Sequence, residues 1–284
     1  MIIEKVINNN VITAVDDSGQ ELVLMGKGIG FQTKAGQSIT EDRIEKKFVM
    51  DTQVDIGKFG ELLKSIPLEH LNVCMEIIEY ASQVLNKRLS GSIYISLTDH
   101  INFALERYRT GLMFENPLLN EIRSFYPSEY LIGEYAVALL EGRMKVKLPV
   151  DEAGSIAMHF INAEYNASMS DTMHVTTLIR EILRIVESET GIFLDDMEIN
   201  HAEFVTHLKY LAHRIFKRAT VGEPAEQLVK AVECLYEREC AIGKQIASFI
   251  KREYDHDISD DELVNLTIYI RRVCSGTEKE IRDV

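Results

Sequence analysis

The chain has 284 residues, 46% of them hydrophobic, and a formal net charge of −14; the length allows two or three compact domains, and the charge argues against general affinity for nucleic-acid phosphates. Its four cysteines form no CxxC pair, which argues against a disulfide framework or a zinc ribbon and favours reduced thiols. No apolar run approaches the roughly 20 residues that span a bilayer, and the first residues lack the features of a signal peptide, so we expect a cytoplasmic protein without membrane insertion.

Residues 1–55 are expected to form a small antiparallel β domain. β-branched residues recur from Glu4 to Val15, a turn is indicated at Asp16-Asp17-Ser18-Gly19, and the strand pattern resumes from Glu21 to Met25. A domain of about 50 residues buries little apolar surface alone. We therefore expect it to dimerise or to pack on a neighbour.

From Asp55 onward the apolar residues follow helical spacing. Phe59, Leu63 and Ile66 share one face, and Pro67 ends that segment before a second apolar stripe. The pattern is typical of helices packed on a common core, and it predicts an all-α region.

A later helix is expected to begin with Asp171 as its N-cap and to end before Gly191. The short polar segment of residues 165–170 precedes it. We interpret this segment as the linker between two all-α domains, residues 60–168 and 172–284.

An internal repeat supports that division. An offset of 110 residues relates Ile132-Gly133 to Ile242-Gly243 and also Asp151-Glu152 to Asp261-Glu262. A related offset of 107 residues joins Thr98–Phe103 to Val205–Tyr210 and Arg107 to Arg214. The sequence therefore predicts a multidomain chain, with a small antiparallel all-β N-terminal domain followed by two homologous all-α helical bundles.

Histidines are the candidate chemical groups of the repeats. His100 and His207 are equivalent, and His159 falls opposite Tyr269. Imidazole titrates near neutrality and can act as a nucleophile, a base or a metal ligand. For each histidine the alternative is a core residue with a satisfied hydrogen bond, but recurrence in both halves favours function. The remaining histidines have no equivalents and are expected to be structural or surface residues: His70, His174, His201, His213 and His256.

Two other chemistries find little support. No HExxH occurs, and His207 and His213 are six residues apart, so we expect no metal, although ligands converging from His100, Asp99, His159 and His207 remain an alternative. The segment Gly26–Phe31 fails the GxGxxG pattern, so we expect no nucleotide cofactor. Its glycines favour positive φ angles or close approach of another molecule to the backbone.

Several segments resemble a known family. Lys5–Val11, Val23–Gln32 and Ile44-Glu45-Lys46 closely resemble the co-antiterminator RNA-binding domain of the BglG/LicT/SacY family. The helical repeats resemble that family's phosphotransferase regulation domains: Ser92–His100 and Asp151–His159 match the first domain, and Phe204–Lys209 matches the second. The resemblance covers the whole chain and implies an RNA-binding transcriptional antiterminator, which is not an enzyme.

The resemblance also implies a mechanism. A homodimer of the β domain would hold an RNA hairpin in a leader transcript and prevent a terminator from forming ahead of sugar-utilisation genes. A sugar-specific enzyme II or the histidine-containing phosphocarrier protein would control the dimer by phosphorylating His100, His159 and His207. A phosphoryl group adds about −1.5 to −2 charges, which can repel acidic neighbours or recruit arginines.

Carried over position by position, the resemblance implies RNA contacts from amides, lysines, glycines and one aromatic residue, chemistry that suits base edges, phosphates and stacking. These residues are Lys5, Asn8, Asn10, Gly26, Lys27, Gly28, Phe31 and Gln32. Without the resemblance, Asn8-Asn9-Asn10 would be interpreted as a polar strand edge or turn and Phe31 as a core residue.

Two positions depart from the family pattern. Lys27 stands where arginine is more usual, which keeps the charge but loses the planar bidentate group. Tyr269 stands where many members carry a fourth histidine, so one phosphorylation site is expected to be missing. Alternatives are a DNA-binding activator with the same regulation domains, which the β-like front disfavours, and a histidine phosphotransfer or metal-dependent enzyme, for which no convergent acid and base set is evident.

Overall fold

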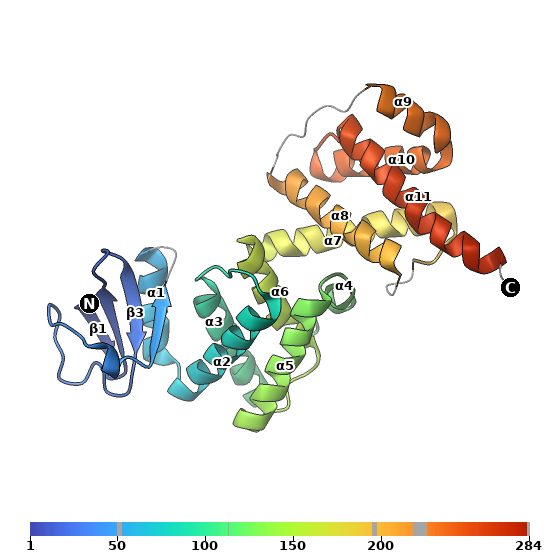
Figure 1. The fold of residues 1–284 in the computed structure, drawn as a ribbon. Coiled ribbons are helices and arrows are strands. Elements are labelled where there is room, and N and C mark those ends of the chain that lie inside the picture. Colours follow the sequence, from blue (N-terminus) through green and yellow to red (C-terminus); the bar gives the residue numbers. More distant parts are fainter. Residues whose placement is uncertain (50–52, 113, 195–197, 218–225, 283–284) are drawn as a thin grey trace. The chain divides into compact units, whose positions relative to one another are not determined.

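The computed structural model describes residues 1–49, 53–112, 114–194, 198–217 and 226–282. The chain divides into two compact units, residues 1–169 and 170–284. Figure 1 shows strands only at the N-terminal end of the first unit, and helices through the rest of both units. The predicted fold class, a small antiparallel β domain followed by helical regions, is confirmed.

The β domain is one antiparallel sheet with strand order β1-β2-β3-β4. Asn9 and Asn10 form the turn after β1, so the β-branched run from Glu4 to Val15 contributes to two strands rather than one. Residues 16–20 join β2 to β3, as the turn residues predict. The strands are β1 (Ile2–Asn8), β2 (Val11–Val15), β3 (Glu21–Met25) and β4 (Lys46–Val49).

The two faces of this sheet have different cores, because alternate residues of a strand point to opposite sides. On one face, Ile12, Leu22 and Leu24 pack with Ile29 and Ile39 of the connection between β3 and β4. The other face carries a separate set of apolar side chains that joins the helical core: Val11, Val23, Met25 and Phe48. The small domain is therefore stabilised by packing on a neighbour within the same unit.

Aromatic rings join the sheet to the helices. Phe48 of β4 contacts Phe59 of α1 and Tyr94 of α3, with ring centroids 5.7 and 5.0 Å apart and edge-on geometry. Figure 1 shows α1 lying along the sheet, and the helices of this unit are α1 (Gln53–Ser65), α2 (Leu68–Leu85), α3 (Ile93–Arg109), α4 (Leu119–Phe125), α5 (Pro127–Met144) and α6 (Asp151–Tyr165).

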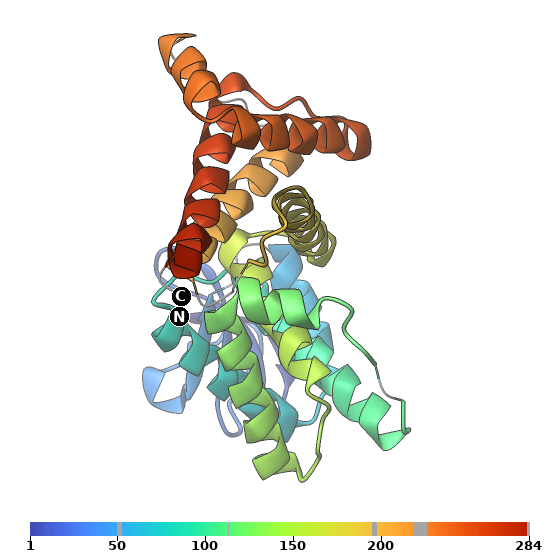
Figure 2. The ribbon, with the colours of Figure 1, turned by 90° about the vertical axis from the view of Figure 1, so that its right-hand side faces the viewer.

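The second unit repeats the helix order of the first. Figure 2 views its helices from a second direction, and their bounds are α7 (Met169–Thr190), α8 (Ile199–Lys217), α9 (Glu226–Leu235), α10 (Glu237–Tyr254) and α11 (Asp260–Arg282). The bounds of α5 and α10 differ by the offset of 110 residues on which the repeat was identified. Helix α9, by contrast, has ten residues where α4 has seven.

One helix start was predicted wrongly. Helix α7 begins at Met169, so Asp171 lies in its first turn and is not the N-cap. An acidic side chain in the first turn still interacts favourably with the helix dipole, which explains why the sequence pattern pointed there. The end is as predicted, since α7 stops at Thr190 and Gly191 has φ +72°.

Glycines explain one repeated motif. A Cβ atom on Gly133 of α5 would lie 2.0 Å from the carbonyl oxygen of Ala153 in α6, so this pair of helices requires glycine. At the equivalent Gly243, the nearest atom is a side-chain carbon of Leu263, at 2.9 Å. The Ile-Gly pairs thus mark the crossing of the last two helices in each repeat. Among the described helices, none is both long and apolar enough to cross a membrane.

Candidate nucleic-acid interface and histidine sites

The glycine-rich loop of residues 26–32 docks on the turn between β1 and β2. The backbone N–H of Gly26 donates to the carbonyl oxygen of Asn10 (3.1 Å), and that of Gly30 donates to Asn9 (3.0 Å). The side-chain oxygen of Asn10 accepts a hydrogen bond from the N–H of Gly28 at 3.0 Å. Two segments of the predicted RNA site, separate in sequence, are therefore held together at one end of the sheet.

Each glycine in this loop has a steric reason. A Cβ atom on Gly26 would lie 2.1 Å from the carbonyl oxygen of Arg43, and one on Gly30 would lie 2.1 Å from that of Asn8. Gly28 has φ +66°, a conformation that costs little only for glycine. The expected positive φ is confirmed at Gly28, whereas at Gly26 and Gly30 the close approach comes from the chain's own backbone and not from another molecule.

Three side chains of this loop are exposed, whereas Ile29 is buried in the core of the sheet. Phe31 is 59% exposed, so it is not the core residue that apolarity alone would suggest. Lys27 and Gln32 are exposed beside it, and Gln32 has φ +56°. Lys5 is also exposed but stands within β1, opposite Thr13.

Asn8 differs from the other predicted contacts because its side chain is already engaged. Its Nδ2 donates to the carbonyl oxygen of Leu63 in α1 at 3.0 Å, and its Oδ1 accepts from the N–H of Asn10 at 2.8 Å. The amide thus joins the loop end of the sheet to α1. A contact between Asn8 and RNA would have to replace or share these bonds.

Sequence reasoning missed Arg43. Its Nη2 donates to the carbonyl oxygens of Gly28 (2.9 Å) and Ile29 (3.4 Å), which fixes the loop from the side of the short 3-10 helix Glu41–Arg43. Arg43 is exposed and directly precedes the motif Ile44-Glu45-Lys46. Its position beside that motif was the available signal.

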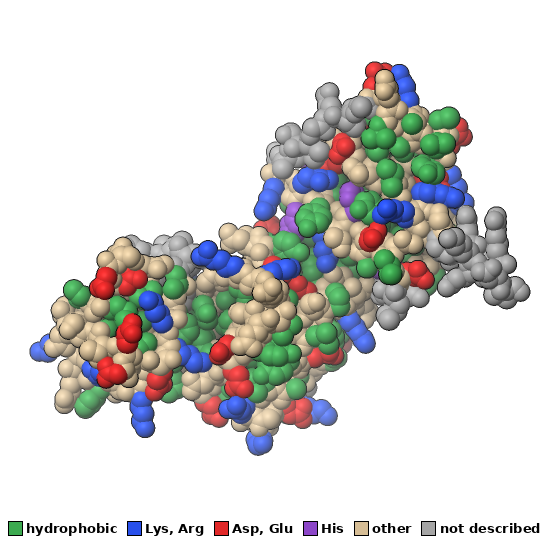
Figure 3. Space-filling model, in the orientation of Figure 1, with side chains coloured by type: hydrophobic (Ala, Val, Ile, Leu, Met, Phe, Trp, Pro, Cys, Tyr) green, Lys and Arg blue, Asp and Glu red, His purple; other side chains and the backbone are tan. Residues whose placement is uncertain are grey.

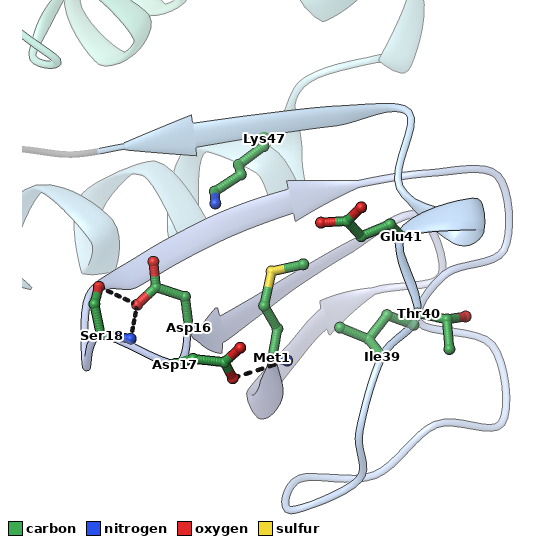
Figure 4. Close-up of a pocket in the computed structure, with 8 residues that line it drawn as sticks. All are labelled: Met1, Asp16, Asp17, Ser18, Ile39, Thr40, Glu41 and Lys47. Atoms are coloured by element: carbon green, nitrogen blue, oxygen red, sulfur yellow. Dashed lines mark hydrogen bonds and ion pairs between the residues drawn. The ribbon is translucent and has the colours of Figure 1, made fainter.

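The opposite end of the sheet is acidic. Asp16 and Asp17 lie in the β2–β3 turn there, and Figure 4 shows them with Glu41 of the 3-10 helix and Lys47 of β4, which lie farther along the sheet. These residues line one hollow of about 590 Å³, with Lys47 as its basic member. Carboxylates repel phosphate, so the turn that carries Asp16 and Asp17 is an unfavourable surface for a nucleic acid. On the face drawn in Figure 3, acidic and basic side chains are interspersed over the β domain.

The histidine site of the first repeat is a network of two histidines, a glutamate and an arginine. His100 Nε2 lies 3.0 Å from Oε2 of Glu152, and Arg107 Nη2 donates to Oε1 at 2.5 Å. The rings of His100 and His159 have centroids 4.7 Å apart. The site therefore forms where α3 meets α6.

The second repeat has the same parts with different pairing. His207 faces Tyr269 with ring centroids 4.6 Å apart, and Arg214 Nε donates to Oε1 of Glu262 at 3.1 Å. Tyr269 thus takes the ring position of His159, as the repeat predicted. A pocket of about 540 Å³ adjoins His207, and its lining includes Arg272, which pairs with Glu203 at 2.8 Å.

Burial controls the charge of these groups. Desolvation lowers the pKa of His159 to about 3, and the nearby His100 adds to the effect. Desolvation and then the charge of Arg214 lower the pKa of His207 to about 4. Burial alone would raise the pKa of Glu152, but hydrogen bonds and charges from His100 and Arg107 outweigh it and hold that pKa below the ordinary value.

The remaining histidines lie outside these networks. His70 is buried and its Nδ1 is 2.9 Å from Oδ1 of Asn102, so it is a core histidine with a partner. His201 is buried in α8, and His174 stacks on Phe216 at 5.9 Å. Sequence analysis used four charged residues only to identify the repeat: Arg107, Glu152, Arg214 and Glu262. Their roles become visible once residues 45 positions apart are in contact.

Comparisons with known proteins agree with this arrangement. The family model described as CAT RNA binding domain matches residues 1–56, and that described as PRD domain matches residues 75–163 and 180–273. Over 273 residues the chain is 44% identical to transcription antiterminator LicT of Bacillus subtilis (strain 168), covering 96% of this chain and 99% of LicT.

Two further proteins are similar. A beta-glucoside operon antiterminator of Dickeya chrysanthemi is 36% identical over 280 residues, which cover 99% of each chain. A crystal structure of GlcT CAT-PRDI has a TM-score of 0.51 and 34% identity, and the match covers 57% of this chain and 97% of that one. Together, a β RNA-binding domain and duplicated regulation domains define an RNA-binding transcriptional regulator rather than an enzyme. The chain belongs to the BglG/LicT/SacY family of transcription antiterminators.

Proposed function

We propose that this antiterminator acts in the cytoplasm as a homodimer that holds a hairpin of a leader transcript and keeps a terminator from forming ahead of sugar-utilisation genes. The observation that carries the proposal is the loop end of the sheet, where Phe31 and Lys27 are exposed beside hydrogen-bonded glycines. Stacking and backbone approach there suit unpaired bases of an RNA hairpin. The domains that we assign are residues 1–55, 60–168 and 172–284.

The RNA contacts that we propose are the eight residues predicted from the sequence: Lys5, Asn8, Asn10, Gly26, Lys27, Gly28, Phe31 and Gln32. Phe31→Ala in the full chain should weaken binding of a leader hairpin about tenfold, because stacking of one base on an aromatic ring contributes roughly 1–3 kcal/mol. The matched control is Phe193→Ala, which removes another exposed phenylalanine, 82% accessible, from the second unit. Equal affinity of the Phe31→Ala variant and the unaltered chain in a gel shift would refute this site.

We further propose that His100, His159 and His207 accept phosphoryl groups from a sugar-specific enzyme II and the histidine-containing phosphocarrier protein, and that this controls dimerisation. Arg107 beside His100 and Arg272 beside the His207 pocket supply cations for an added phosphate. His159 is only 9% exposed, so it should react after the His100 site has opened.

The test uses the full chain with phosphoenolpyruvate and the phosphotransferase proteins. Acid-labile phosphate should map to the three histidines, and light scattering should report a change of oligomeric state on phosphorylation. Phosphate on none of them, or a single oligomeric state throughout, would contradict the regulatory half of the proposal.

A further inference from the structure

One residue differs between the repeats just before their last helix. Pro149 precedes α6 and Ser259 precedes α11, at the same offset of 110 residues that relates Glu152 to Glu262. In both repeats the glutamate lies three residues after this position and binds an arginine of the neighbouring helix. The two repeats therefore differ by proline against serine at this position, while the glutamate and arginine around it are the same.

In the second repeat, Ser259 and Glu262 form reciprocal hydrogen bonds. The N–H and the hydroxyl of Ser259 donate to Oε2 of Glu262 at 2.9 and 3.0 Å, and the N–H of Glu262 donates back to the hydroxyl oxygen at 3.3 Å. This is a capping box at the start of α11. With Oε1 on Arg214, both carboxylate oxygens are engaged, and the buried Nε2 of His207 has no hydrogen-bond partner among the described residues.

In the first repeat a capping box is impossible. Pro149 has neither an N–H nor a hydroxyl to offer, so Oε2 of Glu152 is available to another donor. That donor is Nε2 of His100, at 3.0 Å, while Oε1 holds Arg107. The side chain of Glu152 is 5% exposed, so the bond is shielded from water.

A carboxylate on one nitrogen of imidazole fixes the proton there and leaves the lone pair on the other nitrogen, and it also stabilises the ring when it becomes cationic. We infer that Glu152 is a positioning residue, which holds the proton of His100 on Nε2 and makes Nδ1 the phosphoryl acceptor. In the second repeat Ser259 occupies the equivalent oxygen of Glu262, so His207 has no such carboxylate partner. The inference rests on the proposed function and assigns to the two repeats different reactivity toward a phosphoryl donor.

The proposed transfer to His100 forms one bond to phosphorus and breaks another. The lone pair of Nδ1 forms a bond to phosphorus, the bond from phosphorus to the donor phosphoprotein breaks, and that electron pair leaves with the donor. Nε2 keeps its proton, and the ring acquires a positive charge that Glu152 neutralises. In the second repeat Glu262 stays on Ser259, so the phosphorylated ring of His207 lacks this partner.

The first test is structural and needs no phosphate. In the full chain labelled with 15N-histidine, His100 should show a downfield Nε2–H resonance typical of a carboxylate partner, and His207 should not. Pro149→Ser should build a capping box and abolish the His100 signal, while Ser259→Pro should create one at His207. Ser259→Ala is the second variant if proline disturbs α11; it removes the hydroxyl bond to Glu262 but keeps the N–H bond, so its His207 signal should be weaker than that of Ser259→Pro. Pro67→Ser before α2 is the control for the change of residue type. A His100 resonance unaffected by Pro149→Ser would overturn the inference.

The second test measures initial phosphorylation rates with phosphoenolpyruvate and the phosphotransferase proteins, with sites resolved by mass spectrometry and the nitrogen identified by NMR. Pro149→Ser and Glu152→Gln should each slow modification of His100 about tenfold, the scale of a lost supporting carboxylate. Ser259→Pro should raise the rate at His207. Phosphate on Nε2 of His100, or rates within twofold, would overturn the role of Glu152 and leave phosphorylation itself intact. Absence of phosphate from both histidines, with the His100 resonance present, would overturn the proposed function and this role with it.

Discussion

His159 is a buried neutral imidazole, and this has a consequence for stability against pH. Its pKa in the folded chain is about 3, whereas the ordinary value is 6.5. Above pH 6.5 neither state holds the proton. Below that pH the unfolded chain takes up a proton that the folded chain does not, so the free energy of unfolding should fall as the pH falls from 6.5 toward 3, with a limiting slope of about 1.4 kcal/mol per pH unit.

His159→Gln should remove this part of the slope in denaturant titrations performed between pH 7 and about 5. Only the slopes are compared, because the substitution also changes the absolute stability. The matched control is His174→Gln, the same substitution at an exposed histidine of α7, measured over the same pH range. His207 should contribute in the same direction, since its pKa is about 4. An unchanged slope for His159→Gln would contradict the burial argument.

Two glycines should respond to alanine with opposite signs. Gly26→Ala forces a Cβ atom to within 2.1 Å of the carbonyl oxygen of Arg43, so the backbone must shift and stability should fall by about 1–3 kcal/mol. Gly142→Ala, in α5, meets open space and should raise stability by roughly 0.5 kcal/mol, because alanine favours the helix. Thermal unfolding of the two variants measures both effects. A stable Gly26→Ala variant would mean that the loop relaxes without cost.

At the scale of elements, the contact between β4 and the first helices should govern how the first unit unfolds. Phe48 is 3% exposed and packs on Phe59 and Tyr94. Phe48→Ala should lower the stability by about 3–5 kcal/mol, the usual loss for a buried phenylalanine. Because the core is shared, near-ultraviolet signals from the sheet and from α3 should be lost at one denaturant concentration. Phe31→Ala serves as the control, and two separate transitions in the unaltered chain would contradict the shared core.

The elements also show what sequence periodicity could and could not predict. Strand alternation and the turn at residues 16–19 were sufficient for the sheet, and Pro67 and Gly191 marked helix ends correctly. Asp171 was misplaced as an N-cap, since acidic residues are favoured throughout a first turn. The pairing of His100 with Glu152 joins residues 52 positions apart, and local patterns carry no information on such a contact.

At the scale of the whole molecule, charge limits how RNA can be bound. Residues 1–55 contain six Lys or Arg against nine Asp or Glu, and the chain carries −14 overall. Specific contacts by loop side chains must therefore contribute more than bulk electrostatics. We predict a shallow dependence of RNA affinity on salt, measured as the slope of log affinity against log salt concentration. A slope that corresponds to about eight or more phosphate contacts would contradict this prediction.

The sequence was most informative at this scale. The recurrence of Arg107 and Glu152 as Arg214 and Glu262 identified the duplication, and both ion pairs are present in the structure. The difference between the two histidine sites was not predicted, because it depends on which donor each glutamate binds. Pro149 offers no donor and Glu152 pairs with His100, whereas Glu262 accepts from Ser259. Which donor a buried carboxylate binds depends on all the donors that the fold brings near it, and not on its own residue type alone.

Because the sheet has an apolar core on each face, truncated fragments of this protein will not all expose the same surface. A fragment that stops at residue 55 keeps the core around Ile12 and Leu24. It lacks the helices that cover the other face, which contains Val23 and Phe48. Water would then meet apolar side chains that the intact chain never presents, and such fragments tend to self-associate through them. Dimerisation measured on that fragment would include association through these newly exposed apolar side chains as well as the regulated assembly of the intact chain. A fragment that also contains α1 would keep part of this face covered.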